Sequence, residues 1–186
     1  MACTSHASGS MKLITAIVAA FVISTTSAFG QQGEVESQLP SDALQAAKAT
    51  VIDPTTWAPA TLWYVSSRLD WSSSQVFFRN GYVEGNHFYT VSGLPNDIPV
   101  SYQVGKQRIF TTALVNTELS LANNWTSYML ERMLIRRYPE HRKLIKTLSV
   151  IERISFASYQ TYRLGTMAHF QQWQNNNQLA QQLGIR

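Results

Sequence analysis

The sequence predicts an all-α protein, built as an antiparallel bundle of three long helices plus a short amino-terminal helix and preceded by a signal peptide. Two observations predict this fold class. Apolar residues recur at three- and four-residue spacing over long stretches, as on one face of an α-helix. Gly, Pro, Asn and Asp gather between those stretches, where they favour turns. No period of 20–50 residues recurs, which argues against a solenoid.

The composition is that of a single domain with an unusually weakly charged surface. The chain has 186 residues, and 45% of them are hydrophobic, as in an ordinary globular core. Only 14% are charged, whereas about 25% is usual for soluble proteins. Uncharged polar residues must therefore cover much of the surface, or a membrane or a partner must cover it.

Residues 1–30 have the organisation of a secretory signal peptide. Lys12 precedes the apolar run 13–23, and small residues follow. That run is shorter than the roughly 20 residues needed to span a bilayer. We expect Met11 to be the true start and cleavage to occur before Gln31, with an uncleaved anchor as the alternative. The mature chain is then exported, to a periplasm or cell envelope.

Residues 31–54 are expected to form a polar linker and a short helix. Ser41 is a suitable amino-terminal cap for a helix over 42–51, because its hydroxyl can accept from the backbone of the first turn. The segment 53–56, Asp-Pro-Thr-Thr, is predicted to break that helix.

The bundle domain is predicted to cover residues 55–174, beginning with a long helix over 57–78. Pro59 is tolerated there if it lies in the first turn. The core-facing stripe of this helix is predicted to consist of apolar residues at helical spacing, namely Leu62, Val65, Leu69 and Val76. The following segment, 81–99, is rich in Gly, Pro, Asn and Asp and must be a loop.

Two further long helices complete the predicted bundle. The second covers 105–137 and ends because Tyr138 precedes Pro139, which disfavours helical geometry. The third begins at Pro139 and continues to Trp173, and the amide-rich tail 175–186 is expected to fray. The predicted contact stripe of the third helix is Leu144, Leu148, Ile151, Ser155, Tyr159, Tyr162, Thr166, Phe170 and Trp173.

Small polar residues line the other predicted contacts and raise the question of a membrane. The second helix carries Ala113, Asn116, Ser120, Asn123 and Ser127 along one line. Such residues let helices approach closely and hydrogen-bond inside bilayers. Against spanning, Arg68, Asp70 and Glu118 lie within the helices, and each charge costs about 2.5–3.5 kcal/mol at the bilayer centre. Spanning and surface contact both stay open on the sequence.

The turn between the second and third long helices is basic. Its side chains could meet anionic lipid headgroups, while export argues against nucleic acid as a partner. The simpler interpretation is a solvated hairpin with reciprocal ion pairs between two Glu-Arg dipeptides, Glu131-Arg132 and Glu152-Arg153. The basic residues of the turn are Arg136, Arg137, Arg142, Lys143 and Lys146.

Residues 57–95 contain Leu69-Asp70, then Ser73 and Ser74, then Gly-Tyr-Val-Glu-Gly-Asn at 81–86. This pattern resembles the signature of small uncharacterised bacterial helical membrane proteins, a domain of unknown function. That signature has an intramembrane Asp, a Ser or Thr one turn later, and Gly-x-x-Glu-x-Asn. His87 stands where the pattern usually has proline. The resemblance implies a bilayer location and no known activity.

One group of residues has the chemistry of a metal or general-base site. Glu84 and His87 have the Glu-x-x-His spacing of di-iron bundles, although such sites need the pair twice and on helices. With Asp70, and with His169 as a further candidate, they would form a metal or general-base site. The competing interpretation is structural, with Glu84 and Asn86 tying the loop to the helix that holds Asp70.

Catalytic motifs are otherwise missing from the sequence. It has no Gly-x-Ser-x-Gly, no His-Glu-x-x-His and no phosphate loop. Its single cysteine, Cys3, lies before Met11, the expected true start. We therefore expect no cofactor, no metal and no catalysis. The leading expectation is an exported, membrane-associated bacterial protein with a structural or interaction role and a membrane or envelope protein as its partner. The alternative is an exported enzyme or metal-binding protein using Asp70, Glu84 and His87.

Overall fold

The computed structural model describes residues 39–185 of the chain. The predicted signal peptide, residues 1–30, and most of the predicted linker lie outside the described residues. The chain divides into two compact units, Met1–Gln45 and Ala46–Arg186. Of the first unit only the beginning of helix α3 (Leu39–Ile52) is described. Every feature discussed below belongs to the second unit.

The described part of the second unit is helical, which confirms the all-α class. It contains the end of α3 and the α-helices α4 (Pro54–Arg79), α5 (Tyr102–Arg137), α6 (Arg142–Arg163) and α7 (Thr166–Leu183). Two 3₁₀ turns, η1 (His87–Tyr89) and η2 (Pro139–His141), lie in the connections. Between residues 39 and 185 there is no strand, only two isolated bridges within the 80–101 loop.

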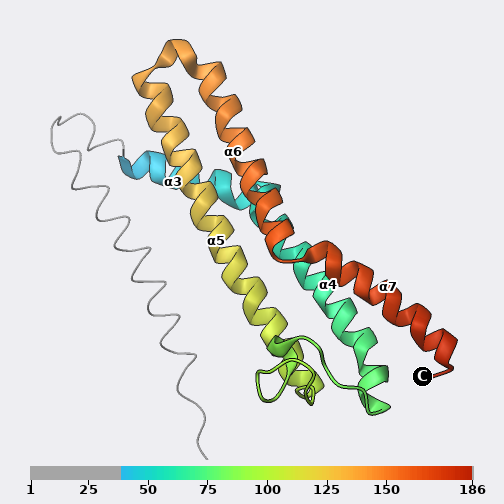
Figure 1. Cartoon of the computed structure of the whole chain (residues 1–186). Helices are drawn as coiled ribbons and strands as arrows, with labels where there is room; N and C mark the ends of the chain where they lie inside the picture. The colour runs from blue at the N-terminus through green and yellow to red at the C-terminus, as the bar shows by residue number, and fades with distance from the viewer. Residues whose placement is uncertain (1–38, 186) are drawn as a thin grey trace, which may run out of the picture. The chain divides into compact units, whose positions relative to one another are not determined.

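Helix α4 contacts all three of the other long helices (Figure 1). Helices α5 and α6 form an antiparallel hairpin closed by η2. Helix α7 packs chiefly on α4 rather than on α6, its neighbour in sequence. The loop between α4 and α5 lies beside the end of α4 and the beginning of α5. One end of α4 is therefore enclosed by α7, by the loop and by α5.

Helix α4 begins three residues earlier than the sequence pattern predicts. Asp53 belongs to the segment that was expected to end the preceding helix. It is the amino-terminal cap of α4, and its carboxylate accepts a hydrogen bond from the backbone N–H of Thr55 at 2.9 Å. Pro54 occupies the first turn, where a missing N–H costs nothing. Pro59 consequently lies inside the helix rather than in its first turn.

The predicted third long helix is divided in two. Gly165 has φ +67°, a left-handed conformation that glycine adopts without steric penalty, and it separates α6 from α7. The chain bends there, and α7 then continues to Leu183. The tail expected to fray from residue 175 is therefore helical, and Asn176 within it is buried.

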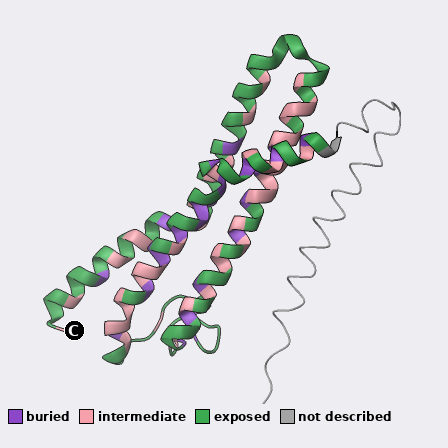
Figure 2. Cartoon of the chain, turned by 180° about the vertical axis from the view of Figure 1, so that it is seen from behind, coloured by how far each residue is buried: buried purple, intermediate pink, exposed green. Residues whose placement is uncertain are grey.

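Figure 2 shows in purple the residues of each helix that are buried. More of these buried residues are polar than the sequence predicts. The expected core residues Leu62 and Val65 of α4 are 45% and 43% exposed, whereas Ser66 and Ser67 are 0% and 1% exposed. Small side chains let neighbouring helices approach closely, which suits serine at these buried positions. On α5, Asn116, Ser120, Asn124 and Ser127 are buried in the same way. Most of the predicted α6 stripe is likewise exposed, namely Leu144, Leu148, Ile151, Ser155, Tyr159 and Tyr162.

The apolar core is small and aromatic. Its buried members come from α4, the loop and α5, and Gly105 of α5 makes room for it. A Cβ at Gly105 would lie 2.2 Å from the Trp71 ring, so only glycine fits between the two helices here. The core residues are Trp63, Trp71, Tyr89, Val100 and Ile109.

None of the helices within residues 39–185 combines the length and the hydrophobicity that crossing a bilayer requires.

Candidate functional site

A polar pocket of about 400 Å³ lies between α4, the loop and the first turns of α7. It combines two carboxylates, one imidazole and two aromatic rings with small polar groups. Its charged and polar lining therefore differs from that of the aromatic core beside it. The lining residues are Ser67, Asp70, Trp71, Ser74, Glu84, Gly85, Asn86, Tyr89, Ala168, His169 and Gln172.

Asp70 and His169 form the central pair of this polar pocket. The Asp70 carboxylate Oδ2 and the His169 ring Nδ1 lie 2.7 Å apart, although 99 residues separate them in sequence. The ring also meets the edge of Trp63, with centroids 6.3 Å apart. A hydrogen bond from Nδ1 to a carboxylate fixes the orientation of an imidazole and leaves Nε2 for chemistry or binding. His169 reaches Asp70 because the bend at Gly165 directs α7 along α4.

Asn176, two turns further along α7, fastens the same helices together. Its amide Nδ2 donates to the Ser73 and Ser74 hydroxyls at 3.1 and 3.0 Å, and lies 3.4 Å from Asp70 Oδ1. Both serine hydroxyls donate to the backbone carbonyl of Asp70, so their oxygens are available as acceptors. These bonds hold the wall formed by α7 in place.

Glu84 enters the polar pocket from the loop. Gly81, with φ +84°, turns the chain after α4, and Glu84 then pairs with Asp97 through two backbone hydrogen bonds of 2.9 and 3.2 Å. Its Oε1 accepts from the backbone N–H of Asn86 at 2.7 Å. Burial raises the pKa of Glu84 above its usual value, and the nearby Asp70 charge raises it further against the lowering effect of its hydrogen bonds. The surroundings of Glu84 in the pocket therefore disfavour the ionised form of its carboxylate.

Two stacked rings form the aromatic wall. Tyr89 is 5% exposed, and its ring centroid lies 5.0 Å from that of Trp71 at an interplanar angle of 24°. The Trp71 indole N–H donates to the Tyr102 carbonyl at 3.1 Å. Burial, reinforced by the Asp70 and Glu84 charges, raises the pKa of Tyr89, so its phenol stays neutral at physiological pH.

The structure brings together two of the three residues that the sequence singles out. Asp70 and Glu84 share the polar pocket, but the side chain of His87 is exposed in η1 and does not line it. His169 supplies the imidazole instead. Within residues 39–185 no group of three His, Cys, Asp or Glu side chains could hold a metal ion. Glu-x-x-His was a misleading signal, because a Gly-flanked loop does not keep the helical register that places such side chains on one face.

A second charged cluster lies where α4, α5 and α6 meet. Arg153, 5% exposed, contacts Asp53 Oδ2 at 3.1 Å and Glu131 Oε2 at 3.5 Å. Its guanidinium also lies 3.9 Å from the centroid of the Tyr128 ring, and the Tyr128 hydroxyl donates to Asp53 at 2.8 Å. Ser149 accepts from the guanidinium at 2.5 Å. Every member of this cluster has a partner, as buried charges require.

The pKa values in this second cluster follow from its hydrogen bonds. Burial by itself would raise the pKa of Asp53, but hydrogen bonds from Thr55 and Tyr128 and the Arg153 charge outweigh it, so the pKa falls below its usual value. Burial and the bond to Asp53 raise the pKa of Tyr128 to about 12. The cluster therefore favours the ionised carboxylate.

One predicted cross-helix contact of the two Glu-Arg dipeptides, Glu131 with Arg153, is present. Glu131 contacts Arg153 across the hairpin, whereas Glu152 accepts from Asn123 at 3.0 Å. Asp53, which the sequence interpretation did not include, is the closest acidic partner of Arg153. The predicted basic residues Arg136, Arg137, Arg142, Lys143 and Lys146 are all exposed around η2.

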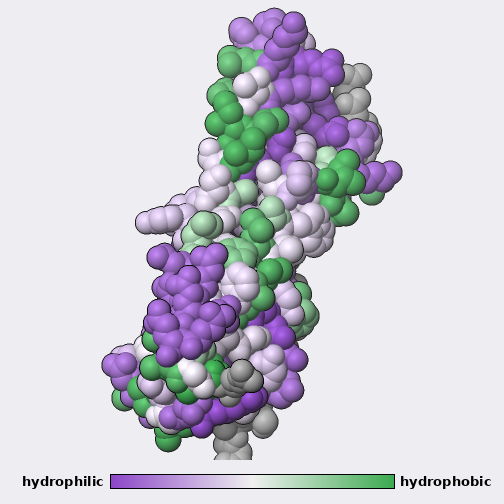
Figure 3. All heavy atoms as spheres, turned by 90° about the vertical axis from the view of Figure 1, so that its right-hand side faces the viewer, coloured by the Kyte–Doolittle hydropathy of each residue, from purple (hydrophilic) through white to green (hydrophobic). Residues whose placement is uncertain are grey.

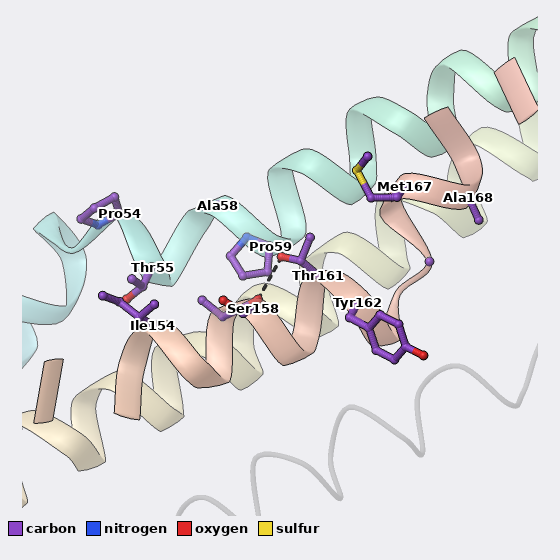
Figure 4. A pocket seen from close by; sticks show the side chains of 12 residues that line it. Pro54, Thr55, Ala58, Pro59, Ile154, Ser158, Thr161, Tyr162, Met167 and Ala168 are labelled. Atoms are coloured by element: carbon purple, nitrogen blue, oxygen red, sulfur yellow. Dashed lines mark hydrogen bonds between the residues drawn. The ribbon is translucent and has the colours of Figure 1, made fainter. Parts of the chain in front are cut away.

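A larger, apolar groove of about 610 Å³ runs beside the beginning of α4 (Figure 4). Pro54, Ala58 and Pro59 line it from α4, and Ile154, Tyr162 and Met167 line it from α6 and α7. No charged side chain lines this groove, so it has no group suited to acid–base or metal chemistry. Of the two, the polar pocket is the one whose lining includes groups suited to acid–base chemistry.

Comparison of the chain with protein-family models, with curated proteins and with solved structures finds no match in any of the three.

Proposed function

We propose that this is an exported helical protein that associates with an anionic membrane surface through the α5–α6 hairpin and has a structural or interaction role without catalysis. The observation that carries the proposal is the hairpin end, where exposed apolar side chains flank a basic turn. This pairing of apolar and basic surface is what interfacial membrane-binding segments present to lipid.

The apolar part of that surface comes from both helices of the hairpin. Each of its side chains is between 42% and 57% exposed, although leucine and tyrosine usually gain by burial. Hydrophobic patches on the surface are visible in Figure 3. The five side chains are Leu130, Leu134, Tyr138, Leu144 and Leu148.

The basic part of that surface supplies attraction to anionic headgroups. Five Lys and Arg side chains lie between residues 136 and 146, against Glu140 alone. Each basic residue near an anionic membrane contributes about 1 kcal/mol. The small, polar contacts between α4 and α5 also suit a protein that works in or beside lipid.

Export follows from the leader and is part of the same proposal. Residues 12–30 have a charged start, an apolar run and a small-residue end. The test is the amino-terminal sequence of the protein recovered from the envelope fraction of a bacterium expressing the full chain. A mature terminus at Gln31 supports the proposal, and a full-length chain in the cytosol contradicts it.

Vesicle flotation tests membrane association. We expect the protein to float with phosphatidylcholine vesicles containing phosphatidylglycerol and to bind pure phosphatidylcholine much less. Replacing Arg142, Lys143 and Lys146 by Gln should weaken partitioning roughly 100-fold, because three charges are removed. Replacing Leu144 and Leu148 by Ser should weaken binding to both kinds of vesicle.

A matched control is Lys48→Gln, which removes an exposed positive charge far along the chain from the turn. It should leave flotation unchanged. Binding that is indifferent to lipid charge, or equal loss in the control and the turn variants, would contradict the proposal.

An exported enzyme or metal-binding protein is the alternative, and the polar pocket is the observation that favours it. Such a protein would use Asp70, Glu84 and His169, with His169 taking the place predicted for His87. Elemental analysis of the purified chain decides between the two. Stoichiometric metal that is lost in His169→Ala but kept in His87→Ala would replace our proposal.

A further inference from the structure

We propose that the polar pocket binds a small organic cation with a primary ammonium group. The two carboxylates of Asp70 and Glu84 would hold the ammonium, and the stacked rings of Trp71 and Tyr89 would cover its aliphatic part. This site goes beyond membrane association, because it assigns a ligand to a different region of the molecule.

The charge of the lining selects a cation. Asp70 and Glu84 are both acidic, and no Lys or Arg side chain lines the pocket. His169 is the one lining group that can become positive, and its Nδ1 is already engaged by Asp70 Oδ2. An ammonium group entering the pocket would compensate the charge repulsion between the two carboxylates that the fold itself leaves in place.

An orphaned hydroxyl points independently to a ligand. Ser67 is 1% exposed and lines the pocket, yet its Oγ has no hydrogen-bond partner. Buried polar groups without partners are rare in native proteins, since each one loses its hydration without compensation. An ammonium carries three N–H donors, so one ligand can serve Ser67 as well as a carboxylate.

The aromatic wall is suited to the same ligand. The Trp71 indole N–H is used by the Tyr102 carbonyl, so Trp71 offers the pocket ring surface rather than a donor. The two rings stack on each other, so the pocket meets apolar ring atoms, against which the aliphatic carbons of the ligand can pack. A volume of about 400 Å³ lies within the range of small-molecule sites.

Isosteric ligands test the proposal on the unmodified protein. With the purified full chain, we would measure calorimetric binding and thermal stabilisation by n-butylamine, n-butanol and n-butyrate. These probes share a four-carbon skeleton and differ in charge. We expect n-butylamine to bind at least 10-fold more tightly than n-butanol, and n-butyrate not to bind.

The decisive variant is Glu84→Gln. Glu84 hydrogen-bonds within its own loop, so the neutral isostere should fold, whereas Asp70 fastens α7 and its replacement could unfold the wall. Losing a charged partner should weaken n-butylamine binding about 10- to 100-fold. The matched control, Glu118→Gln, removes an exposed carboxylate of α5 and should bind as the unmodified chain does.

Three results would overturn the proposal: equal affinity for n-butylamine and n-butanol, no binding of n-butylamine at about 10 mM, or unchanged affinity in Glu84→Gln. Stoichiometric binding of Zn²⁺ in competition with n-butylamine would also overturn it, because the site would then be a metal centre.

Discussion

Two clusters in the second unit have the same ingredients and opposite properties. Each has two carboxylates and one basic side chain: Asp53 and Glu131 with Arg153, and Asp70 and Glu84 with His169. In the Arg153 cluster both carboxylates contact the guanidinium. In the His169 cluster only Asp70 contacts the imidazole, and Glu84 faces the pocket.

The difference separates a cluster that stabilises the fold from one that leaves a carboxylate without a cationic partner. Arginine has five donors and a permanent charge, so it can satisfy two acids at once. In the other cluster only one ring nitrogen of His169, Nδ1, meets a carboxylate, that of Asp70. The pKa values move accordingly, below the usual value for Asp53 and above it for Glu84. The saturated cluster stabilises the fold, whereas the unsaturated one lines the pocket in which we propose a ligand.

The largest expected effect comes from removing the cation of the saturated cluster. Arg153→Ala leaves Asp53 and Glu131 without their charged partner in a buried setting and should lower the free energy of unfolding by about 3–5 kcal/mol. Urea denaturation at pH 7 measures this. Lys143→Ala, at an exposed basic position of α6, is the control and should change stability little. A loss below about 1 kcal/mol in Arg153→Ala would mean that the cluster is not a structural anchor.

Overpacking the aromatic wall should be the next largest effect. A Cβ at residue 105 lies 2.2 Å from the Trp71 ring, so Gly105→Ala should cost about 1–3 kcal/mol. It should also alter the near-ultraviolet circular dichroism of the tryptophans. At Gly85 the nearest atom to an added Cβ lies 3.9 Å away, and Gly85→Ala should leave that spectrum unchanged. An altered spectrum in both variants would contradict this account.

The unsaturated cluster predicts a stabilising substitution. The raised pKa of Glu84 means that the folded chain binds this proton more tightly than the unfolded chain does. Its contribution is favourable below the usual value of 4.5 and is lost as the pH rises through the folded-state pKa. Glu84→Gln should therefore raise the urea midpoint slightly at pH 7, with the gain disappearing below about pH 4.

Asp53→Asn should show the opposite sign and sharpens the comparison. Asp53 has a lowered pKa, so its charge contributes stability above the usual value of 3.8, and that stability is lost as the pH falls through the folded-state pKa. Asp53→Asn should be less stable than the unmodified chain at pH 7, and the difference should shrink in acid. If both substitutions destabilise at pH 7, the contrast between the clusters fails.

The smallest effect is expected at the orphaned hydroxyl. Ser67→Ala breaks no hydrogen bond within the fold, so stability should change by no more than about 0.5 kcal/mol. Ser149 accepts from Arg153 at 2.5 Å, and Ser149→Ala should cost about 1 kcal/mol or more. Equal losses in thermal unfolding would show that the Ser67 hydroxyl has a partner in the protein.

How far the sequence led can be judged from particular residues. The end of α5 before Pro139 and the loop over 81–99 were predicted correctly, because proline and glycine constrain the backbone locally. The next helix, predicted to begin at Pro139, begins at Arg142 after the 3₁₀ turn η2. Of the small polar line predicted on α5, Asn116, Ser120 and Ser127 are buried, whereas Ala113 and Asn123 are half-buried.

Leu62 and Val65 were wrongly predicted to face the core. Apolar periodicity identifies one face of a helix but does not show what packs against that face. His169 was named beside Asp70 only as a further candidate. Their direct pairing could not be derived from the local sequence, because it depends on where two helices cross.

Because the chain bends at Gly165, the polar pocket forms only when α7 docks on α4. His169, Gln172 and Asn176 all lie beyond that bend, on a helix that packs chiefly on α4. If α7 lifted away, Asp70 would lose His169 and Asn176, and Ser73 and Ser74 would lose Asn176. Arg153 and its carboxylates would keep their contacts. The pocket therefore exists only while α7 is docked on α4. A molecule that binds in the pocket would shift the equilibrium toward the docked position of α7.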